Sequence, residues 1–104
     1  MWPRRIVLIL VALCGQPVSV QAETIRVTID KLVFSPAAIM AKAGDTIEWV
    51  NKDILAHTAT ATNGDWSVLI APKQAARLVV SKAGDVDYFC KYHPNMKGRL
   101  TVAR

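Results

Sequence analysis

The amino-acid sequence predicts an all-β fold, a Greek-key β-sandwich or barrel of about seven to eight short strands. Three observations support this prediction. Short segments alternate apolar and polar residues, turn-forming pairs such as Gly-Asp and Asn-Gly separate them, and no segment keeps a helical period over three turns. Short strands at regular spacing are typical of an antiparallel sandwich or barrel, and 104 residues leave room for one such domain.

Four segments stand out in the first half of the domain, and they are the strand 24–30, a short apolar run at 32–34, and the segments 37–42 and 46–51. The first and last of these alternate cleanly, which is typical of a half-buried strand. The third could be a strand or one helical turn, and the closely bracketing Pro36 and Gly44 favour the strand. In the fourth, Ile47 and Trp49 lie on one face, so we expect both in the core.

The second half contributes the segments 58–62, 66–70, 75–81, 85–90 and 98–103. Asn63-Gly64 ends the first of them with a turn, and the second fits either a short strand or a packed loop. The fourth segment ends on Cys90, and the last alternates again and closes the chain. Between the two halves, residues 51–56 read as a loop that leads to His57.

Residues 1–22 predict a cleaved secretory signal, followed by the domain at 23–104. A short basic start precedes an apolar run at 6–14, which is too short to span a bilayer comfortably, and residues 20–22 are small enough for a signal peptidase. An uncleaved anchor is the alternative. We expect an exported protein without stable membrane insertion, located in the periplasm, or secreted if the source has no outer membrane.

Charge and cysteine content narrow the classes of partner. Removing 1–22 takes away Arg4 and Arg5, so the formal charge falls from +5 to +3. No basic run or stacking motif suggests nucleic acid, although an acidic protein partner is compatible with this charge. Removal of Cys14 leaves Cys90 alone in an oxidising compartment. Such a cysteine is a reactive thiol, an intermolecular bridge, a metal ligand or an inert buried side chain.

The neighbours of Cys90 favour the metal ligand. Cys90, His93 and Met96 follow one another at a spacing of three residues, and each gap spans at most about 10 Å. A thiolate and a thioether favour copper, and a blue copper centre needs two histidines, one cysteine and a weak axial methionine. The chain has two histidines, and the other is His57. These four residues therefore make a complete ligand set.

The chain resembles the cupredoxins, small type 1 blue copper proteins, and within them the amicyanin and plastocyanin-like branch. The residues that carry the resemblance are Ala43–Asn51, His57 and Asp87–Gly98, and the short gap between His93 and Met96 is typical of amicyanins. The resemblance covers essentially all of 23–104 and implies a cupredoxin-like fold. The motif around Cys90 is quite specific, whereas the strand pattern alone is not.

The resemblance implies a role for each matched residue. His57, Cys90 and His93 would be the strong equatorial ligands of one type 1 copper per chain, and Met96 would be the weak axial ligand. The backbone N–H of Thr58 would donate a hydrogen bond to the Cys90 sulfur, and such bonds tune the metal. Asn51 matches the family's asparagine ahead of the first ligand.

Three positions depart from the family pattern. Thr58 stands where cupredoxins usually have asparagine, so we expect its hydroxyl to replace part of that hydrogen bonding. Tyr92 stands where amicyanin-type loops often have proline, and its N–H could donate a second bond to the sulfur, which taken alone would raise the reduction potential. Asn95 replaces an aromatic residue, which makes the surface near His93 more polar.

The resemblance implies a carrier of single electrons between redox partners. A metal with four protein ligands leaves no open position for a substrate, so we expect no enzyme. The family suggests a c-type cytochrome and a dehydrogenase donor as partners of a monomeric protein. Electrons would pass at the edge of His93, in an apolar patch formed by Leu55, Ala56, Ala71, Pro72 and Pro94. A basic rim that steers an acidic partner would consist of Lys52, Lys73, Lys91 and Lys97.

Three other functions remain open at this point. A periplasmic copper carrier or chaperone could deliver or sequester copper with the same four ligands and no redox partner. A zinc site could use Cys90 and the two histidines, although Met96 argues against zinc, which prefers harder ligands. An exported interaction module would carry its cysteine and histidines incidentally.

Overall fold

The computed structural model describes residues 21–104. The predicted signal at 1–22 therefore lies outside the described residues, apart from its last two positions. The described part forms nine strands and no helix, so it contains no helical membrane span. The strands are β1 (Thr24–Asp30), β2 (Val33–Ser35), β3 (Ala38–Lys42), β4 (Thr46–Asn51), β5 (His57–Ala61), β6 (Ser67–Ile70), β7 (Ala75–Val79), β8 (Gly84–Phe89) and β9 (Lys97–Ala103).

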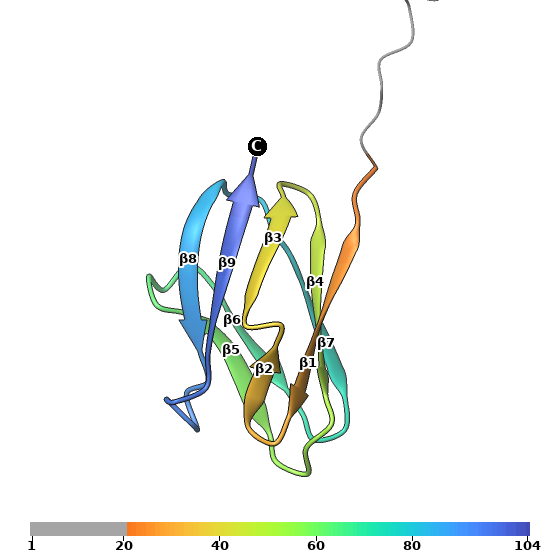
Figure 1. Cartoon of the computed structure of the whole chain (residues 1–104), viewed down its shortest axis with the longest axis vertical. Coiled ribbons are helices and arrows are strands. Elements are labelled where there is room, and N and C mark those ends of the chain that lie inside the picture. The colour runs from red at the N-terminus through yellow and green to blue at the C-terminus, as the bar shows by residue number, and fades with distance from the viewer. Residues whose placement is uncertain (1–20) are drawn as a thin grey trace, which may run out of the picture.

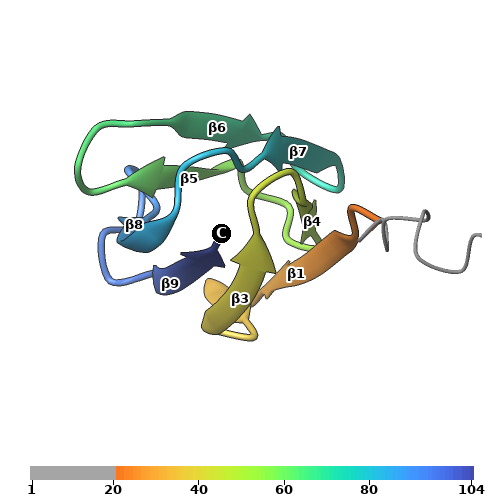
Figure 2. The ribbon, with the colours of Figure 1, turned by 90° about the horizontal axis from the view of Figure 1, so that it is seen from above.

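The strands form two sheets that face each other across one core (Figures 1 and 2). One sheet has the order β2-β1-β4-β7, and the other has the order β3-β9-β8-β5-β6. This confirms the predicted all-β sandwich, with nine strands in place of seven to eight. The segments 37–42 and 66–70, for which the sequence left an alternative open, are both strands.

The pairing is not purely antiparallel, and here the sequence-based expectation is wrong. β1 pairs with β4 in parallel, and β3 pairs with β9 in parallel, whereas the other pairs are antiparallel. Alternating apolar and polar residues show which face of a strand is buried, but they do not show the direction of its neighbour. The sequence pattern could not distinguish the two kinds of pair.

Alternation along the strands builds the core. Val27, Ile29, Ile47 and Trp49 are fully buried, which confirms the core positions expected for β4. Successive side chains of a strand point to opposite faces, so these residues on β1 and β4 line the same side of their sheet. Trp66 packs at the edge of this core, with its ring centroid 5.8 Å from that of Trp49.

Tyr88 anchors the second sheet at the place where the predicted ligand loop begins. Its ring packs edge-on against Phe34 and Trp49, and its hydroxyl accepts a hydrogen bond from Trp49 Nε1 at 3.4 Å. Burial raises the pKa of Tyr88 above its ordinary value. Gly98, its partner in the β8–β9 register, has no room for a side chain, because an added Cβ would lie 2.2 Å from Tyr88 Cζ. This close contact holds together the two strands that carry the loop.

The outer face of the first sheet carries a cross-strand ion pair network. Arg26, Glu48 and Arg77 lie side by side in the register of β1, β4 and β7. Glu48 accepts from Arg77 and from Arg26 at 2.8 and 2.9 Å, and its side chain is nearly buried between theirs. Hydrogen bonds from Arg77 and Arg26 hold the pKa of Glu48 below its ordinary value, against the opposing effect of burial.

Four connections meet at the lower end of the sandwich in Figure 1: the β1–β2 turn, the β4–β5 loop, the β6–β7 turn and the β8–β9 loop. The residues singled out in the sequence as metal ligands all belong to the ends of strands or to loops at this end.

Candidate metal centre

The structure brings three of the predicted ligand side chains together. His57 is the first residue of β5, Cys90 directly follows β8, and His93 lies in the β8–β9 loop. Cys90 Sγ is 3.7 Å from His57 Nδ1 and 3.8 Å from His93 Nδ1, and the three donor atoms all lie within 4.8 Å of one another. His57 and Cys90 are fully buried, whereas His93 is partly exposed.

These separations fit one ion bound by all three side chains. A first-row ion lies about 2.0 Å from an imidazole nitrogen and about 2.3 Å from a thiolate, as zinc sites illustrate. Two donors that share an ion must be closer than the sum of these lengths, and the distances from Cys90 Sγ to both histidines meet this condition. Two imidazoles and one thiolate are the equatorial donors of a type 1 copper site, so the cluster fits copper.

The loop between the two ends of the motif is closed by its own backbone. Cys90 N–H donates to Met96 O at 3.1 Å, His93 N–H donates to Cys90 O at 3.2 Å, and Met96 N–H donates to His93 O at 2.8 Å. Met96 is 3% exposed and belongs to the same buried hydrophobic cluster as Cys90. The motif is therefore folded as one tight turn in which Met96 faces the protein interior.

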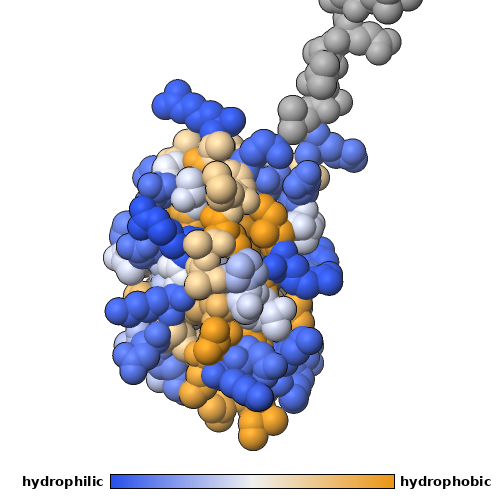
Figure 3. All heavy atoms as spheres, viewed as in Figure 1, coloured by the Kyte–Doolittle hydropathy of each residue, from blue (hydrophilic) through white to orange (hydrophobic). Residues whose placement is uncertain are grey.

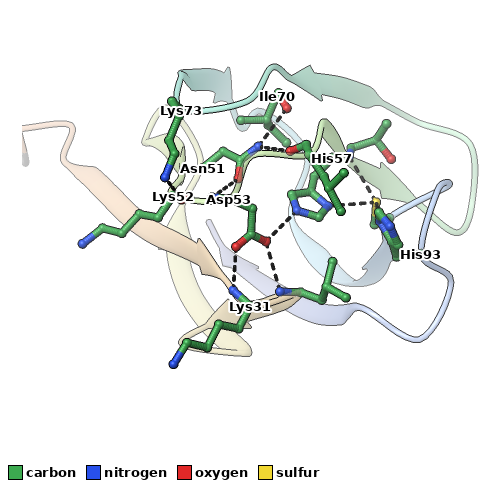
Figure 4. A network of polar contacts seen from close by, with 12 residues as sticks. Lys31, Asn51, Lys52, Asp53, His57, Ile70, Lys73 and His93 are labelled. Atoms are coloured by element: carbon green, nitrogen blue, oxygen red, sulfur yellow. Dashed lines mark hydrogen bonds and ion pairs between the residues drawn. The ribbon is translucent and has the colours of Figure 1, made fainter.

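A partly buried carboxylate orients His57 (Figure 4). His57 Nε2 lies 2.8 Å from Asp53 Oδ2. Burial alone would raise the pKa of Asp53, but hydrogen bonds from Leu32 N–H, the His57 ring and Lys31 N–H hold that pKa below its ordinary value. An ionised carboxylate can only accept, so Nε2 carries the proton and donates it. Nδ1, which faces the Cys90 sulfur, keeps its lone pair free for a metal.

Asp53 was not predicted as part of the site, although the sequence contained a signal for it. A metal-bound histidine almost always donates its second ring N–H to a carboxylate, carbonyl or water. A carboxylate four residues before His57, in the loop that leads to it, was a candidate for that partner. What the sequence could not show is that Asp53 also binds the β1–β2 turn. It accepts from Lys31 N–H at 2.7 Å and from Leu32 N–H at 3.1 Å.

That turn has an unusual backbone. Lys31 and Leu32 both have positive φ, 52° and 64°, although neither is glycine. Side chains with a Cβ rarely adopt this conformation, and it costs energy. The two hydrogen bonds to Asp53 offset that cost, and they join the turn to the carboxylate that holds His57.

Asn51 holds the β4–β5 loop in place by hydrogen bonds of its side-chain amide (Figure 4). Its amide nitrogen lies 2.8 Å from Leu55 O, 3.2 Å from Ala71 O and 3.3 Å from Ile70 O. Its carbonyl oxygen accepts from Asp53 N–H at 2.9 Å. One buried amide therefore closes the β4–β5 loop and joins it to the end of β6. This is the structural role of Asn51, which the resemblance matched to the family's asparagine ahead of the first ligand.

The Cys90 sulfur accepts a hydrogen bond from the backbone of Thr58. The distance from Thr58 N to Cys90 Sγ is 3.3 Å, as the resemblance implied. The second bond considered for Tyr92 N–H is not among the hydrogen bonds of residues 21–104. The turn closed by His93 N–H on Cys90 O leaves Tyr92 facing outward, 58% exposed. The raised potential inferred from that bond loses its basis.

Apolar side chains gather at this end of the molecule (Figure 3). Of the patch predicted around His93, Leu55, Ala71, Pro72 and Pro94 are exposed and Ala56 is partly exposed. The structure adds Leu32 and Ile54, which are 43% and 80% exposed. We call Leu32, Ile54 and Leu55 the apolar end.

The four lysines of the predicted rim are all exposed, and they are Lys52, Lys73, Lys91 and Lys97. One of them is also held in place, because the Lys73 ammonium donates to Lys52 O across the β4–β5 loop (Figure 4). Positive charge therefore lies on the connections around the candidate site, and Lys91 is in the same loop as His93.

The sequence of the chain is similar to a family model and to several known proteins. The family model described as a cupredoxin-like domain matches residues 4–102. The amicyanin of Paracoccus versutus is 30% identical over 89 residues, which cover 80% of this chain and 67% of that protein. The amicyanin of Paracoccus denitrificans is 32% identical over 84 residues, which cover 75% of this chain and 64% of that protein. The chain thus spans about two thirds of the length of these relatives.

The fold agrees with the sequence comparison. The solved structure of the Paracoccus versutus amicyanin superposes with a TM-score of 0.68 at 31% identity, covering 81% of this chain and 85% of that chain. At this identity and coverage, the likeness extends over most of the described sandwich.

Proposed function

Because the chain belongs to the cupredoxin-like family, we propose that it is a type 1 blue copper protein that carries single electrons between redox partners. Its metal ligands are His57, Cys90, His93 and Met96. Bound copper supplies one-electron chemistry there, by alternating between Cu(I) and Cu(II). The observation that carries the proposal is the convergence of two imidazole Nδ1 atoms on the buried Cys90 sulfur at 3.7 and 3.8 Å.

The way the ligands are held supports electron transfer. Asp53 fixes the tautomer and orientation of His57, Asn51 closes its loop, and the Thr58 N–H binds the Cys90 sulfur. A site whose donors are in place before the metal binds needs little rearrangement when the charge on the metal changes. Such rigidity suits a carrier that must accept and release an electron quickly.

The proposal also includes Met96 as the fourth ligand and no enzymatic turnover of a substrate. Met96 is buried in the cluster that contains Cys90, and its thioether would be the fourth, weak donor to the copper. Four protein donors leave no open position for a substrate, whereas catalytic metal sites keep one. We therefore assign the protein the role of a carrier and no enzymatic activity.

The partners are redox proteins that dock at the metal end. The partly exposed His93 ring, the apolar end and the lysine rim offer an apolar contact surrounded by positive charge. An acidic partner fits this surface, since complementary charge accelerates association. Relatives include a methylamine utilization protein MauL, 29% identical over 96 residues, and the amicyanins. By that analogy the donor is a dehydrogenase and the acceptor a c-type cytochrome, and the protein acts as a monomer.

The proposal also includes export of the protein to the periplasm. Residues 1–22 act as a signal peptide that is removed, and the domain at 23–104 works in the periplasm. The composition of that segment supports this assignment, with its basic start and its short apolar run.

The direct test is a visible absorption spectrum of residues 23–104 titrated with Cu(II), beside Cys90→Ser. We expect an intense blue band that saturates at one copper per chain and is absent from the variant. Stopped-flow reduction by a c-type cytochrome then separates an electron carrier from a copper carrier, which would instead transfer its copper rapidly to a chelator. A protein without the blue band that binds Cu(I) or Zn²⁺ tightly would overturn the electron-transfer proposal.

A further inference from the structure

A line of three hydroxyl groups runs across the second sheet to the ligand loop. Thr58 and Thr60 lie two residues apart on β5, and Ser67 is opposite Thr60 in the register of β5 and β6. Thr60 Oγ1 is 3.0 Å from Thr58 Oγ1 and 2.8 Å from Ser67 Oγ. Thr58 and Thr60 are 5% and 7% exposed, whereas Ser67 is exposed. We call these three residues the hydroxyl line.

The direction of each hydrogen bond in the line follows from the proton count. A hydroxyl has one proton to donate and two lone pairs with which to accept. Thr60 donates its proton to Thr58 Oγ1, so Ser67 must be the donor to Thr60. Thr58 Oγ1 also accepts from Lys91 N–H at 2.8 Å. The Thr58 oxygen is thus held between a donor from its own strand and a donor from the ligand loop.

Thr58 therefore forms hydrogen bonds to two consecutive residues, Cys90 and Lys91. Its backbone N–H donates to Cys90 Sγ, and its side chain accepts from the N–H of Lys91, the next residue. The other backbone hydrogen bonds of the loop run within the loop itself, between Cys90, His93 and Met96. The bonds of Thr58 instead connect the loop to the strand that begins with His57. They join Cys90 and Lys91 to the same strand as His57, whose Nδ1 lies 3.7 Å from the Cys90 sulfur.

We propose that the hydroxyl line positions the Cys90 thiolate, and that Thr58 is the residue through which it acts on the ligand loop. This inference rests on the proposed copper function for its consequence, but the positioning exists in the metal-free protein. In this chain the support extends through Thr60 to Ser67 on the edge strand β6.

The test compares Thr58→Val, which keeps the β-branched shape and removes the hydroxyl, with Thr58→Ser, which keeps the hydroxyl. Thr62→Val is the matched control, because Thr62 is exposed and directly follows β5. Two readouts use metal-free protein: hydrogen exchange of the Lys91 amide and the reaction rate of the Cys90 thiol with a disulfide reagent. We expect Thr58→Val to accelerate Lys91 exchange about tenfold, as loss of one hydrogen bond does, and to raise thiol reactivity.

The copper-loaded protein provides two further readouts, the blue band and the reduction potential. In Thr58→Val the backbone N–H that donates to the sulfur remains, but the loop beside Cys90 loses its bond to the hydroxyl. The sulfur is then held less firmly relative to this N–H, so we expect the band to shift and the potential to fall. Thr58→Ser should restore both. A merely structural role would lower the unfolding temperature without moving either signal. Thr60→Val leaves Thr58 in place and removes its second donor, so it should give an intermediate acceleration of Lys91 exchange even if Thr58→Val fails to fold.

The outcomes separate this inference from the proposed function. If Lys91 exchange and thiol reactivity in Thr58→Val and Thr60→Val match those of Thr62→Val, the positioning role is wrong, whatever the copper spectrum shows. If both readouts change while the wild-type protein forms no blue band, the positioning role stands and the electron-carrier proposal fails.

Discussion

The carboxylate of Asp53 lies 2.8 Å from Nε2 of His57, and it binds the backbone of the β1–β2 turn at the same time. The buried ring of His57 and a surface turn therefore share one acceptor. This arrangement explains two features together. His57 is held with Nδ1 toward Cys90, and Lys31 and Leu32 can keep their positive φ angles.

Replacing Asp53 should weaken metal binding. In Asp53→Ala, the His57 ring loses its acceptor and both tautomers become accessible. We expect copper affinity to fall by about 10- to 100-fold, the usual effect of removing such a partner. Competition titration against a chelator measures the affinity. Asp30→Ala, at an exposed carboxylate on the end of β1, is the control and should leave it unchanged. Equal affinities for the two variants would contradict the orienting role.

Met96 should be distinguishable from an ordinary core methionine. In Met96→Leu the blue band should persist, because the thiolate remains. Loss of one donor disfavours the more highly charged Cu(II) more than Cu(I), which tolerates a lower coordination number, so the potential should rise by on the order of 60 mV, which is tenfold in the one-electron equilibrium. Cyclic voltammetry measures the change. Met40→Leu is the matched control, since Met40 is 77% exposed on β3. An unchanged potential would remove Met96 from the ligand set.

The ion pair network around Glu48 should make the stability of the fold depend on pH. The pKa of Glu48 is lower in the folded protein than its ordinary value of 4.5, chiefly through Arg77 and then Arg26. The unfolded chain therefore binds this proton first as pH falls. The stabilising contribution of Glu48 is complete above pH 4.5 and is lost as the pH drops toward the folded pKa.

Urea unfolding of Glu48→Gln at several pH values checks this prediction. The variant should be less stable than wild type at pH 7, and the difference should shrink as the pH falls below about 4.5. Glu23→Gln, at an exposed position ahead of β1, should follow the wild-type curve. A difference that stays constant with pH would mean that the charge of Glu48 is not the cause.

Because Gly98 lies directly against Tyr88, adding one methyl group at position 98 should lower the stability of the fold. In Gly98→Ala, the new Cβ would overlap the Tyr88 ring, and we expect a loss of about 1–3 kcal/mol in the free energy of unfolding. A double-mutant cycle with Tyr88→Leu isolates the cause, because the smaller side chain makes room for the methyl group. The prediction fails if Gly98→Ala costs the same in both backgrounds.

The apolar end should affect partner association without affecting the metal. Ile54→Ser removes an 80% exposed apolar side chain from the loop before His57. We expect the second-order rate of electron exchange with an acidic c-type cytochrome to fall by about tenfold, with an unchanged potential. Met40→Ser removes a similarly exposed side chain from β3 and should leave the rate unchanged. Equal rates for both variants would move the docking site elsewhere.

Much of the fold could be predicted because burial follows local pattern. Alternation at β1, β4 and β9 identified the strands and their buried faces, and Trp49 lies in the core as expected. β2 was recognised only as a short apolar run, since three residues show little periodicity. The parallel pairs of β1 with β4 and of β3 with β9 join segments that are distant in the chain, and no local pattern encodes them.

The sequence by itself determined which side chains are available for metal binding. Their types and the spacing of Cys90, His93 and Met96 are chemical facts of the chain, and a chain with only one other histidine leaves His57 as the partner. Only the tertiary structure decided how these groups are held. The acceptor of the Leu32 N–H lies 21 residues away on Asp53, and the acceptor of the Lys91 N–H lies 33 residues away on Thr58. Hydrogen bonds of this kind depend on which strands become neighbours, and that choice is made by packing of the whole core.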